Sequence, residues 1–437
     1  MTTVVGIDIG TTSAKICATI GDEIICALKQ CYSVEKENEN ENENGVQNAQ
    51  IIVKTSMELF ENVKKVLESR EPSKRIDEVW VCGQMHGIVL WNQESLTTDS
   101  PVTSSLYNWT YSPPDQSDFL STLPEWSCGQ VRPGFGLATL AYLYRSEPES
   151  LKKYNRCGTI MDLFLVTLLV LHSRETAVPM SHHNAHSWGY CSNECSWQAD
   201  ILPLLPHWIQ LPIIVRDCRR VVSTLNGAKC HVASGDLQAS VASLDVYEEN
   251  TAYLILGTSA QLCCLVNPKE IPETLTESVV KLPYSEIKQL MAACSMNGGN
   301  ALETVLKLHS NSPYSTQKLA NLLKDLDRNA PPLPSDLRID PIFIPERGLS
   351  KKPSVNGISP DTSDLQILEA THFGIIDNLF SMYPESLLKS LKISCLALVG
   401  AAQSARFKRH IEAIAGKDFK LIFPKTEIST PLGATRF

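Results

Sequence analysis

The start of the chain has the pattern of a β-hairpin. Apolar and small residues fill positions 4–9 and resume at 16–20, and the turn Gly10-Thr11-Thr12 separates the two segments. Two short apolar segments joined by a tight turn are typical of adjacent antiparallel strands. We therefore expect the chain to open with a hairpin.

Helical and strand patterns alternate along the rest of the chain. Residues 56–69 carry apolar side chains at helical spacing, and residues 78–82 form an apolar run that leads into Gly83-Gln84-Met85-His86-Gly87. Further helices are expected at 137–145, 162–171 and 365–382, and further strands at 252–256, 395–399 and 420–423. Helices that alternate with buried strands predict an α/β fold.

The chain is expected to consist of two halves, because its 437 residues exceed what one ordinary core holds. The apolar strand at 252–256 runs into Gly257-Thr258-Ser259, which repeats the Gly-Thr turn of the first hairpin. Two such units predict a duplicated architecture, although a match of three residues is also compatible with coincidence. We place the boundary between residues 245 and 246.

Two segments are expected to be loops. Residues 35–44 consist almost entirely of Glu and Asn and offer no apolar side chain to bury. Residues 331–364 are rich in Pro, Ser and Asp, which are typical of irregular connections.

Composition limits the classes of function. A hydrophobic fraction of 43% and a charged fraction of 20% indicate a globular protein, and a net charge of -9 argues against binding along a nucleic-acid backbone. No apolar run approaches the roughly 20 residues of a membrane span, and no secretory leader is visible. The 14 cysteines are irregularly spaced, unlike a disulfide framework. We expect a cytoplasmic protein without nucleic-acid or membrane partners; the sequence predicts no oligomeric state.

The first candidate for chemistry is the opening turn. Backbone amides of Gly10, Thr11 and Thr12 could point at an anion, and Lys15 could screen its charge. Asp8, at the end of the preceding strand, is placed to hold a magnesium ion. A plain hairpin with a structural aspartate explains the same pattern.

The second candidate is Asp236, which follows the small residues Ala233-Ser234-Gly235. Small neighbours let a ligand approach the backbone, so this carboxylate could accept a proton from an attacking hydroxyl. The alternative is that Asp236 caps a helix that begins near Leu237.

Three further turns could lie along a nucleotide: Gly257-Thr258-Ser259, Asn297-Gly298-Gly299-Asn300 and Gly400-Ala401-Ala402. Each alone is explained by an ordinary turn beside an apolar segment. His86 lies in a Gly-flanked loop, where binding residues are commonly presented.

Taken in this order, the segments resemble the FGGY carbohydrate kinase family, whose fold is shared with actin and hexokinase. The resemblance covers nearly the whole chain. Its anchors are Gly6-Ile7-Asp8-Ile9-Gly10-Thr11-Thr12-Ser13-Ala14-Lys15, Gly83-Gln84-Met85-His86-Gly87, Gly235-Asp236, Gly257-Thr258-Ser259 and Asn297-Gly298-Gly299-Asn300. The second anchor is similar to the ketose-kinase branch, such as xylulokinases. Other segments are similar to sedoheptulokinases: Thr159-Ile160-Met161-Asp162, Ser187-Trp188-Gly189-Tyr190, Gly235-Asp236-Leu237-Gln238-Ala239-Ser240 and Asn378-Leu379-Phe380-Ser381-Met382.

The resemblance implies an α/β fold of two ribonuclease H-like (actin/hexokinase-like) domains flanking an interdomain cleft. Residues 1–245 would bind the sugar and carry the first phosphate turn. Residues 246–437 would bind the nucleotide and end in a shortened terminal helix.

The resemblance also implies roles for individual residues, with ATP and Mg²⁺ as cofactors. Asp236 would be the general base and contact the sugar, and Asp8 and Asp236 would hold the metal. The phosphates would be bound by Gly10, Thr11, Thr12, Lys15, Gly257 and Thr258, and the adenosine by Gly299, Gly400 and Ala401. The sugar would be bound by Gln84, Met85, His86 and Trp109.

The implied activity is ATP-dependent phosphorylation of a ketose at a primary hydroxyl, with sedoheptulose converted to sedoheptulose 7-phosphate. Two positions after Trp109, where the family usually has an acidic residue, this chain has Tyr111. A xylulokinase-like pentulose kinase, a catalytically weak sugar- or nucleotide-binding regulator and an actin-like or chaperone ATPase are the alternatives.

Overall fold

The chain folds into two units, one of Met1–Ser243 together with Ser429–Phe437 and one of Leu244–Ile428. The computed structural model describes residues 1–32, 45–172, 178–244, 249–309, 316–346, 349–425 and 428–437. The boundary expected between residues 245 and 246 lies outside these residues, as does the Glu/Asn tract at 35–44. No helix among the described residues is both long and apolar enough to span a membrane.

The central sheet of the first unit has the strand order β11-β12-β5-β1-β2-β3, and β13 pairs with β5. β1 pairs antiparallel with β2, as the hairpin pattern predicts, and parallel with β5. The strands are β1 (Thr3–Ile9), β2 (Ser13–Ile20), β3 (Glu23–Cys31), β5 (Glu78–Gly83), β11 (Val221–Leu225), β12 (Ala228–His231) and β13 (Ser234–Gly235).

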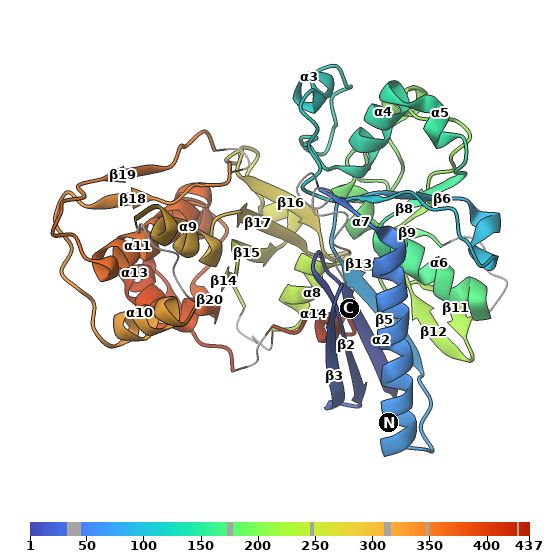
Figure 1. Cartoon of the computed structure of the whole chain (residues 1–437), viewed down its shortest axis with the longest axis horizontal. Helices are drawn as coiled ribbons and strands as arrows, with labels where there is room; N and C mark the ends of the chain where they lie inside the picture. Colours follow the sequence, from blue (N-terminus) through green and yellow to red (C-terminus); the bar gives the residue numbers. More distant parts are fainter. Residues whose placement is uncertain (33–44, 173–177, 245–248, 310–315, 347–348, 426–427) are drawn as a thin grey trace. The chain divides into compact units, whose positions relative to one another are not determined.

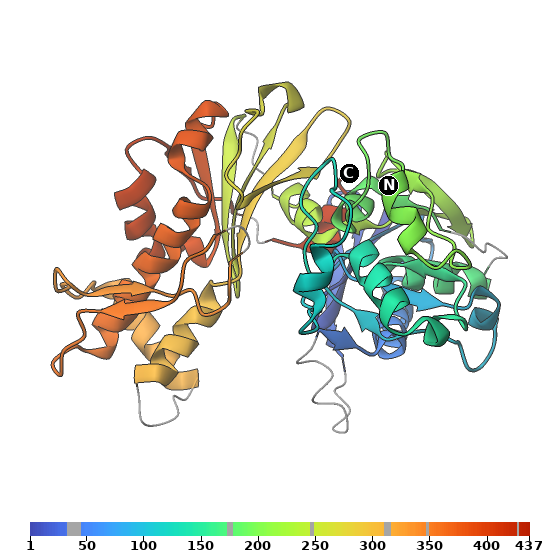
Figure 2. The same ribbon diagram turned by 90° about the horizontal axis from the view of Figure 1, so that it is seen from above.

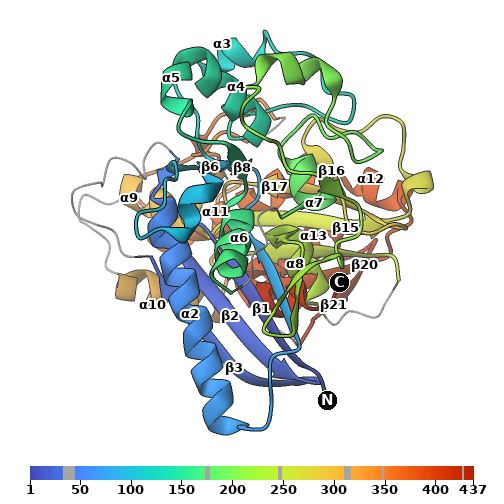
Figure 3. The same cartoon turned by 90° about the vertical axis from the view of Figure 1, so that its right-hand side faces the viewer.

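Helices cover both faces of this sheet (Figure 1). α2 (Ala49–Arg70) and α6 (Ile160–His172) lie against one face and against each other, which Figure 3 also shows. Both confirm predicted helices, and α2 begins earlier than predicted because Asn48 caps it by accepting a hydrogen bond from the Ile51 amide. On the other face lie α8 (Asp236–Ala242) and α14 (Thr430–Ala434).

The last residues belong to the first unit, so assigning all of 246–437 to a second domain is wrong for 429–437. α14 packs against β1, β5 and α8. The contact is close because Gly6 and Gly433 have no side chains: a Cβ at Gly6 would overlap the Pro431 carbonyl, and one at Gly433 would overlap that of Ala239.

A second hydrophobic cluster in the first unit lies around the fully buried Trp188 and Tyr190. Gly136, at the start of predicted helix α4 (Gly136–Ser146), lets the Trp188 ring pack directly on the backbone. The remaining helices here are α3 (Gln116–Leu120), α5 (Pro148–Leu151) and α7 (His182–Ser187). Short strand pairs are β4 (Val46–Gln47) with β7 (Leu106–Tyr107), β6 (Val89–Trp91) with β8 (Arg156–Gly158), and β9 (Met180–Ser181) with β10 (Ile214–Val215).

The second unit repeats the strand scheme of the first. Its sheet order is β16-β17-β15-β14-β20-β21, and β14 pairs antiparallel with β15 and parallel with β20. This matches β1 with β2 and β5, as the repeated Gly-Thr turn predicts. The strands are β14 (Thr251–Leu256), β15 (Ala260–Val266), β16 (Val279–Pro283), β17 (Gln289–Ser295), β20 (Cys395–Gly400) and β21 (Lys420–Ile422).

Helices of the second unit, orange and red in Figure 2, lie along one side of its yellow-green strands. They are α9 (Gly299–His309), α10 (Thr316–Arg328), α11 (Asp364–Met382), α12 (Glu385–Ser390) and α13 (Ala405–Ala415). The region expected to be an irregular loop at 331–364 contains a strand pair, β18 (Arg338–Asp340) with β19 (Ser354–Asn356). The pair forms because Leu337 and Ile339 bury their side chains against Ile367 and Ala370 of α11.

Candidate active site

Two carboxylates of the first unit meet at one edge of its sheet. Asp8 near the end of β1 pairs with Cys82 of β5, which pairs on its other side with Ser234 of β13. Asp236 follows β13 as the first residue of α8. Because the carboxyl ends of parallel strands share one edge of a sheet, Asp8 and Asp236 are brought together, and repulsion from Asp8 raises the pKa of Asp236.

The pKa of Asp236 is raised from 3.8 to about 7. Burial is the largest cause and Asp8 the second, while the Leu237 amide, 2.8 Å from Oδ1, opposes them. Gly235 is the N-cap of α8, but Asp236, the first residue of the helix, accepts from the Leu237 amide, so the expected helix-capping role is met in part. A partly exposed carboxylate that titrates near neutrality is suited to accept a proton from a hydroxyl.

Asp8 is almost fully buried, at 3% exposure. Burial raises the pKa of its carboxyl, while Lys15, 3.2 Å from Oδ2, and the hydroxyl of Thr430 oppose that rise. Thr430 comes from α14, the segment that returns to this unit from the end of the chain. No local sequence pattern predicts this contact, because it joins opposite ends of the chain.

The turn between β1 and β2 is anchored through its oxygen atoms. Gln84 Nε2 donates to the Gly10 carbonyl over 3.2 Å, and Trp109 Nε1 donates to the Thr11 hydroxyl over 3.1 Å. Gln47 Nε2 donates to the Thr11 carbonyl over 2.8 Å. The amide of Gly10 bonds to Ser13 O within the hairpin, so an anion at this turn would depend on the partly exposed Thr11 and the exposed Thr12.

The residues expected to bind sugar divide into three places. Gln84 and Trp109 contact the β1–β2 turn. Met85 lies beside Gly235, the residue before Asp236, since its sulfur is 2.6 Å from where a Cβ of Gly235 would stand. His86, with a left-handed φ of 73°, stacks on Phe135 at 4.7 Å between ring centroids. Sequence reasoning therefore found the residues around the turn but missed Gln47, which has no motif around it.

His86 is held from two sides by Ser187. Its backbone amide donates to Ser187 Oγ over 3.1 Å, and its Nδ1 lies 2.7 Å from the Ser187 carbonyl. Because a carbonyl only accepts, Nδ1 carries the hydrogen. A left-handed backbone is uncommon for histidine and is stabilised here by these contacts.

The second unit brings together the other set of predicted residues. The Gly299 amide donates to the Gly257 carbonyl over 2.9 Å, and the Asn300 amide to the Thr258 carbonyl over 3.2 Å. Gly400 pairs with Leu256 at the ends of β20 and β14. The turns at 257–259, 298–300 and 400–402 thus adjoin, and Gly257, Thr258 and Gly400 are exposed.

Alanine at Gly400 is expected to destabilise this cluster. Gly400 has φ 66°, and an added Cβ would lie 2.5 Å from the Leu256 carbonyl. Strain and overlap together predict a loss of about 2 kcal/mol in the free energy of unfolding, measured by chemical denaturation. Gly227→Ala is the matched control, because Gly227 also has positive φ but nothing within 4 Å of its Cβ position. Equal losses in the two variants would contradict the close contact at Gly400.

The carboxylate pair also fits a magnesium ion. Mg²⁺ commonly takes one or two carboxylates and completes its shell with water and phosphate oxygens. Asp8 and Asp236 supply that number, beside a turn suited to an anion. Within the described ranges no group of three or more His, Cys, Asp and Glu side chains forms a site that would hold a metal without such external ligands.

Comparison with known proteins finds curated relatives and structural neighbours, although no family model matches. Mouse sedoheptulokinase is 29% identical over 445 aligned residues, which cover 91% of this chain and 89% of the relative. Human sedoheptulokinase is 31% identical over 366 residues, which cover 75% of this chain and 73% of the relative.

Solved structures agree in fold at low sequence identity. Ligand-bound xylulose kinase from Lactobacillus acidophilus has a TM-score of 0.77 at 16% identity and covers 100% of this chain and 88% of its own. Glycerol kinase from Plasmodium falciparum, solved with ADP, has a TM-score of 0.78 at 16% identity, and the match covers 99% of this chain and 88% of the glycerol kinase.

Proposed function

Because the chain belongs to the FGGY carbohydrate kinase family and is an ATP-dependent sugar kinase, we propose that its substrate is a ketose phosphorylated at a primary hydroxyl. Sedoheptulose, converted to sedoheptulose 7-phosphate, is the proposed substrate, because the two sedoheptulokinases match most of the chain. The alternative substrate is a pentulose such as xylulose, and the shape of the sugar pocket would determine which of the two sugars is preferred.

One observation carries the proposed chemistry: Asp236 is a partly exposed carboxylate whose pKa is raised to about 7 beside Asp8. We propose that Asp236 orients the sugar hydroxyl and accepts its proton as the oxygen bonds to the γ-phosphorus and ADP leaves. Phosphoryl transfer needs little covalent help, so position and charge compensation are the main contributions of the protein. Met85, next to Gly235, is proposed to contact the sugar beside that carboxylate.

Asp8 and Asp236 are proposed to hold Mg²⁺, directly or through water. The ion would supply charge compensation for the phosphates. Thr11, Thr12 and Lys15 are proposed to face the phosphates, and Lys15 is suited to this because its side chain is 44% exposed. Gln84 and Trp109 support the turn and are proposed to contact sugar, as is His86.

The nucleotide is assigned to the second unit. Gly257, Thr258, Gly299, Gly400 and Ala401 form adjoining turns, which we propose contact the phosphates and the adenosine. Glycine at positions 257, 299 and 400 leaves the backbone accessible to a ligand.

ADP release measured with a panel of sugars tests the proposal. Release that depends on sedoheptulose is expected, and a higher kcat/KM for xylulose would favour the pentulose alternative instead. Nucleotide binding without turnover would contradict the enzymatic proposal and support a regulatory protein. Hydrolysis that is independent of sugar would indicate an ATPase.

A further inference from the structure

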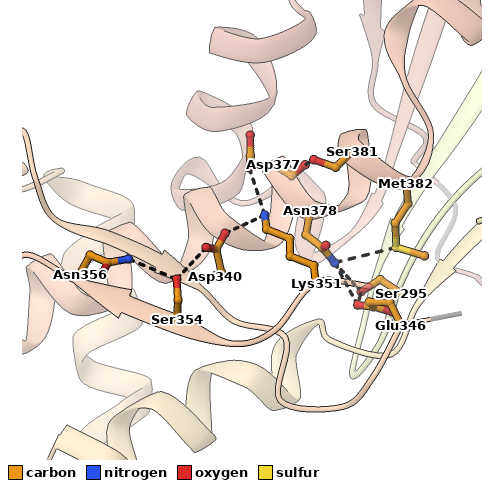
Figure 4. A network of polar contacts seen from close by, with 10 residues as sticks. All are labelled: Ser295, Asp340, Glu346, Lys351, Ser354, Asn356, Asp377, Asn378, Ser381 and Met382. Carbon is orange, nitrogen blue, oxygen red and sulfur yellow. Dashed lines mark hydrogen bonds and ion pairs between the residues drawn. The ribbon is translucent and has the colours of Figure 1, made fainter. Parts of the chain in front are cut away.

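Glu346 is a buried carboxylate to which the sequence assigns no role. It lies between β18 and β19 and is 7% exposed. Its Oε1 accepts hydrogen bonds from Ser295 Oγ at 2.5 Å, Asn297 Nδ2 at 2.7 Å and Asn378 Nδ2 at 2.9 Å. Its Oε2 accepts from the Met296 amide at 3.0 Å. Figure 4 shows Ser295 and Asn378 converging on this carboxylate.

Three of these four donors belong to one short segment. Ser295 ends β17, and Met296 and Asn297 lead to Gly298 and the start of α9. A carboxylate that accepts from three consecutive residues fixes the path of that backbone. Desolvated donors without this acceptor would destabilise the segment.

The same segment is fixed on its other sides by amide side chains. Asn297 Oδ1 accepts from the Ile344 amide at 2.9 Å, and its Nδ2 lies 2.7 Å from the Ile344 carbonyl. Asn300 Oδ1 accepts from the Gly298 amide at 2.8 Å, and its Nδ2 donates to the Met296 carbonyl at 2.9 Å. An unbroken series of hydrogen bonds therefore connects Glu346 to the start of α9.

The strand pair that flanks Glu346 is itself fixed to α11. Lys351 Nζ lies 2.7 Å from Asp340 of β18 and 3.9 Å from Asp377 of α11 (Figure 4). Asn378, the next residue of α11, is a donor to Glu346. The carboxylate is thus held at a set position against the sheet.

We propose that Glu346 is a positioning residue for the nucleotide, an inference that rests on the proposed function of the second unit. It fixes Ser295–Asn297, and through them the Gly299 amide that bonds to the Gly257 carbonyl at 2.9 Å. The position of the proposed nucleotide turns thereby depends on a carboxylate that does not belong to any of them.

The test is Glu346→Gln, which keeps the size of the side chain. An amide has one acceptor oxygen, so its NH₂ group must face either the Met296 amide or the donors at Oε1. We expect the KM for ATP and the dissociation constant for ADP to rise about tenfold, with little change in the KM for sugar.

Glu369→Gln is the matched control. Glu369 is also a buried glutamate of this unit, but it binds Arg409 at 2.8 Å and His410 at 3.1 Å, both on α13. This variant is expected to lose thermal stability while its KM for ATP stays unchanged. If Glu346→Gln does not fold, Ser295→Ala removes one donor and is expected to weaken ADP binding about threefold.

Direct calorimetry with ADP separates this inference from the proposed function. If wild type and Glu346→Gln bind ADP with the same dissociation constant, the positioning role of Glu346 is overturned, while the nucleotide assignment stands. Equal rises in the KM values for ATP and sugar would overturn it too, because they would indicate a general loss of structure. Wild type that fails to bind ADP would contradict the nucleotide assignment itself.

Discussion

Replacing Asp236 with Asn is expected to lower kcat about a thousandfold while the chain still folds. The amide keeps the shape of the side chain but accepts no proton from the sugar hydroxyl. Steady-state ADP release at saturating ATP and sugar measures the loss. Activity of wild type is expected to fall as pH drops below about 7, because the carboxylate becomes protonated.

Asp162→Asn is the control for this variant. Asp162 is a buried carboxylate of the same unit whose pKa is raised to about 6, and it accepts hydrogen bonds from Thr159 at the start of α6. Its replacement changes a similar group away from the proposed site, so kcat is expected to stay near that of wild type. An Asp236→Asn enzyme with a near-normal kcat would remove Asp236 from the role of general base.

Asp236→Asn is also expected to raise the free energy of unfolding above neutral pH. The folded pKa of about 7 exceeds the unfolded value of 3.8, so the folded chain binds this proton more tightly. Ionised Asp236 therefore destabilises the folded state above pH 7, and the penalty shrinks as pH falls from 7 toward 4. The melting temperature of Asp236→Asn should be higher than that of wild type at pH 8, and the two should be nearly equal at pH 4.

Alanine at Gly433 is expected to lower the free energy of unfolding by about 3 kcal/mol, and kcat about a hundredfold. The added methyl would overlap the Ala239 carbonyl and lie 2.9 Å from the Ser243 amide nitrogen. Ala239 lies in the middle of α8 and Ser243 directly follows the helix, which Asp236 begins. Relief of the overlap moves α8, and with it the proposed base. Denaturation midpoints and kcat measure the two effects.

Gly257→Ala controls for the general cost of adding a methyl group, in the stability measurement only. Nothing lies closer than 4.0 Å to its Cβ position, so its free energy of unfolding should change little. A Gly433→Ala variant as stable as wild type would contradict the close packing of α14 on α8.

Local patterns predicted the parts of the fold that depend on neighbours in sequence. The β1–β2 hairpin and the helix α11 follow from apolar spacing and turn residues within one segment. The Pro- and Ser-rich composition of the region around β18 and β19 predicts a loop. The structure instead has a strand pair there, because Ile339 packs against α11. Tertiary burial outweighed local propensity at this point.

The site was predictable only where the residue types themselves carry chemistry. Asp8 stands out at the end of a strand before a tight turn, and Asp236 stands out after three small residues, although their spacing in the sequence does not predict that they meet. Gln47, Thr430 and Glu346 act through contacts with distant segments, at Thr11, Asp8 and Ser295. No local pattern distinguishes such residues from ordinary polar positions.

A kinase for sedoheptulose moves the γ-phosphate of ATP onto that sugar, so the fate of this phosphate is the decisive measurement. Purified protein would be incubated with Mg²⁺, sedoheptulose and ATP labelled in the γ-phosphate, and the products resolved by phosphorus NMR and mass spectrometry. Label is expected as a phosphate ester on the C7 hydroxyl, and in far smaller amount after the same time with Asp236→Asn. Label found only in inorganic phosphate, or left in ATP, would contradict the phosphorylation of sedoheptulose.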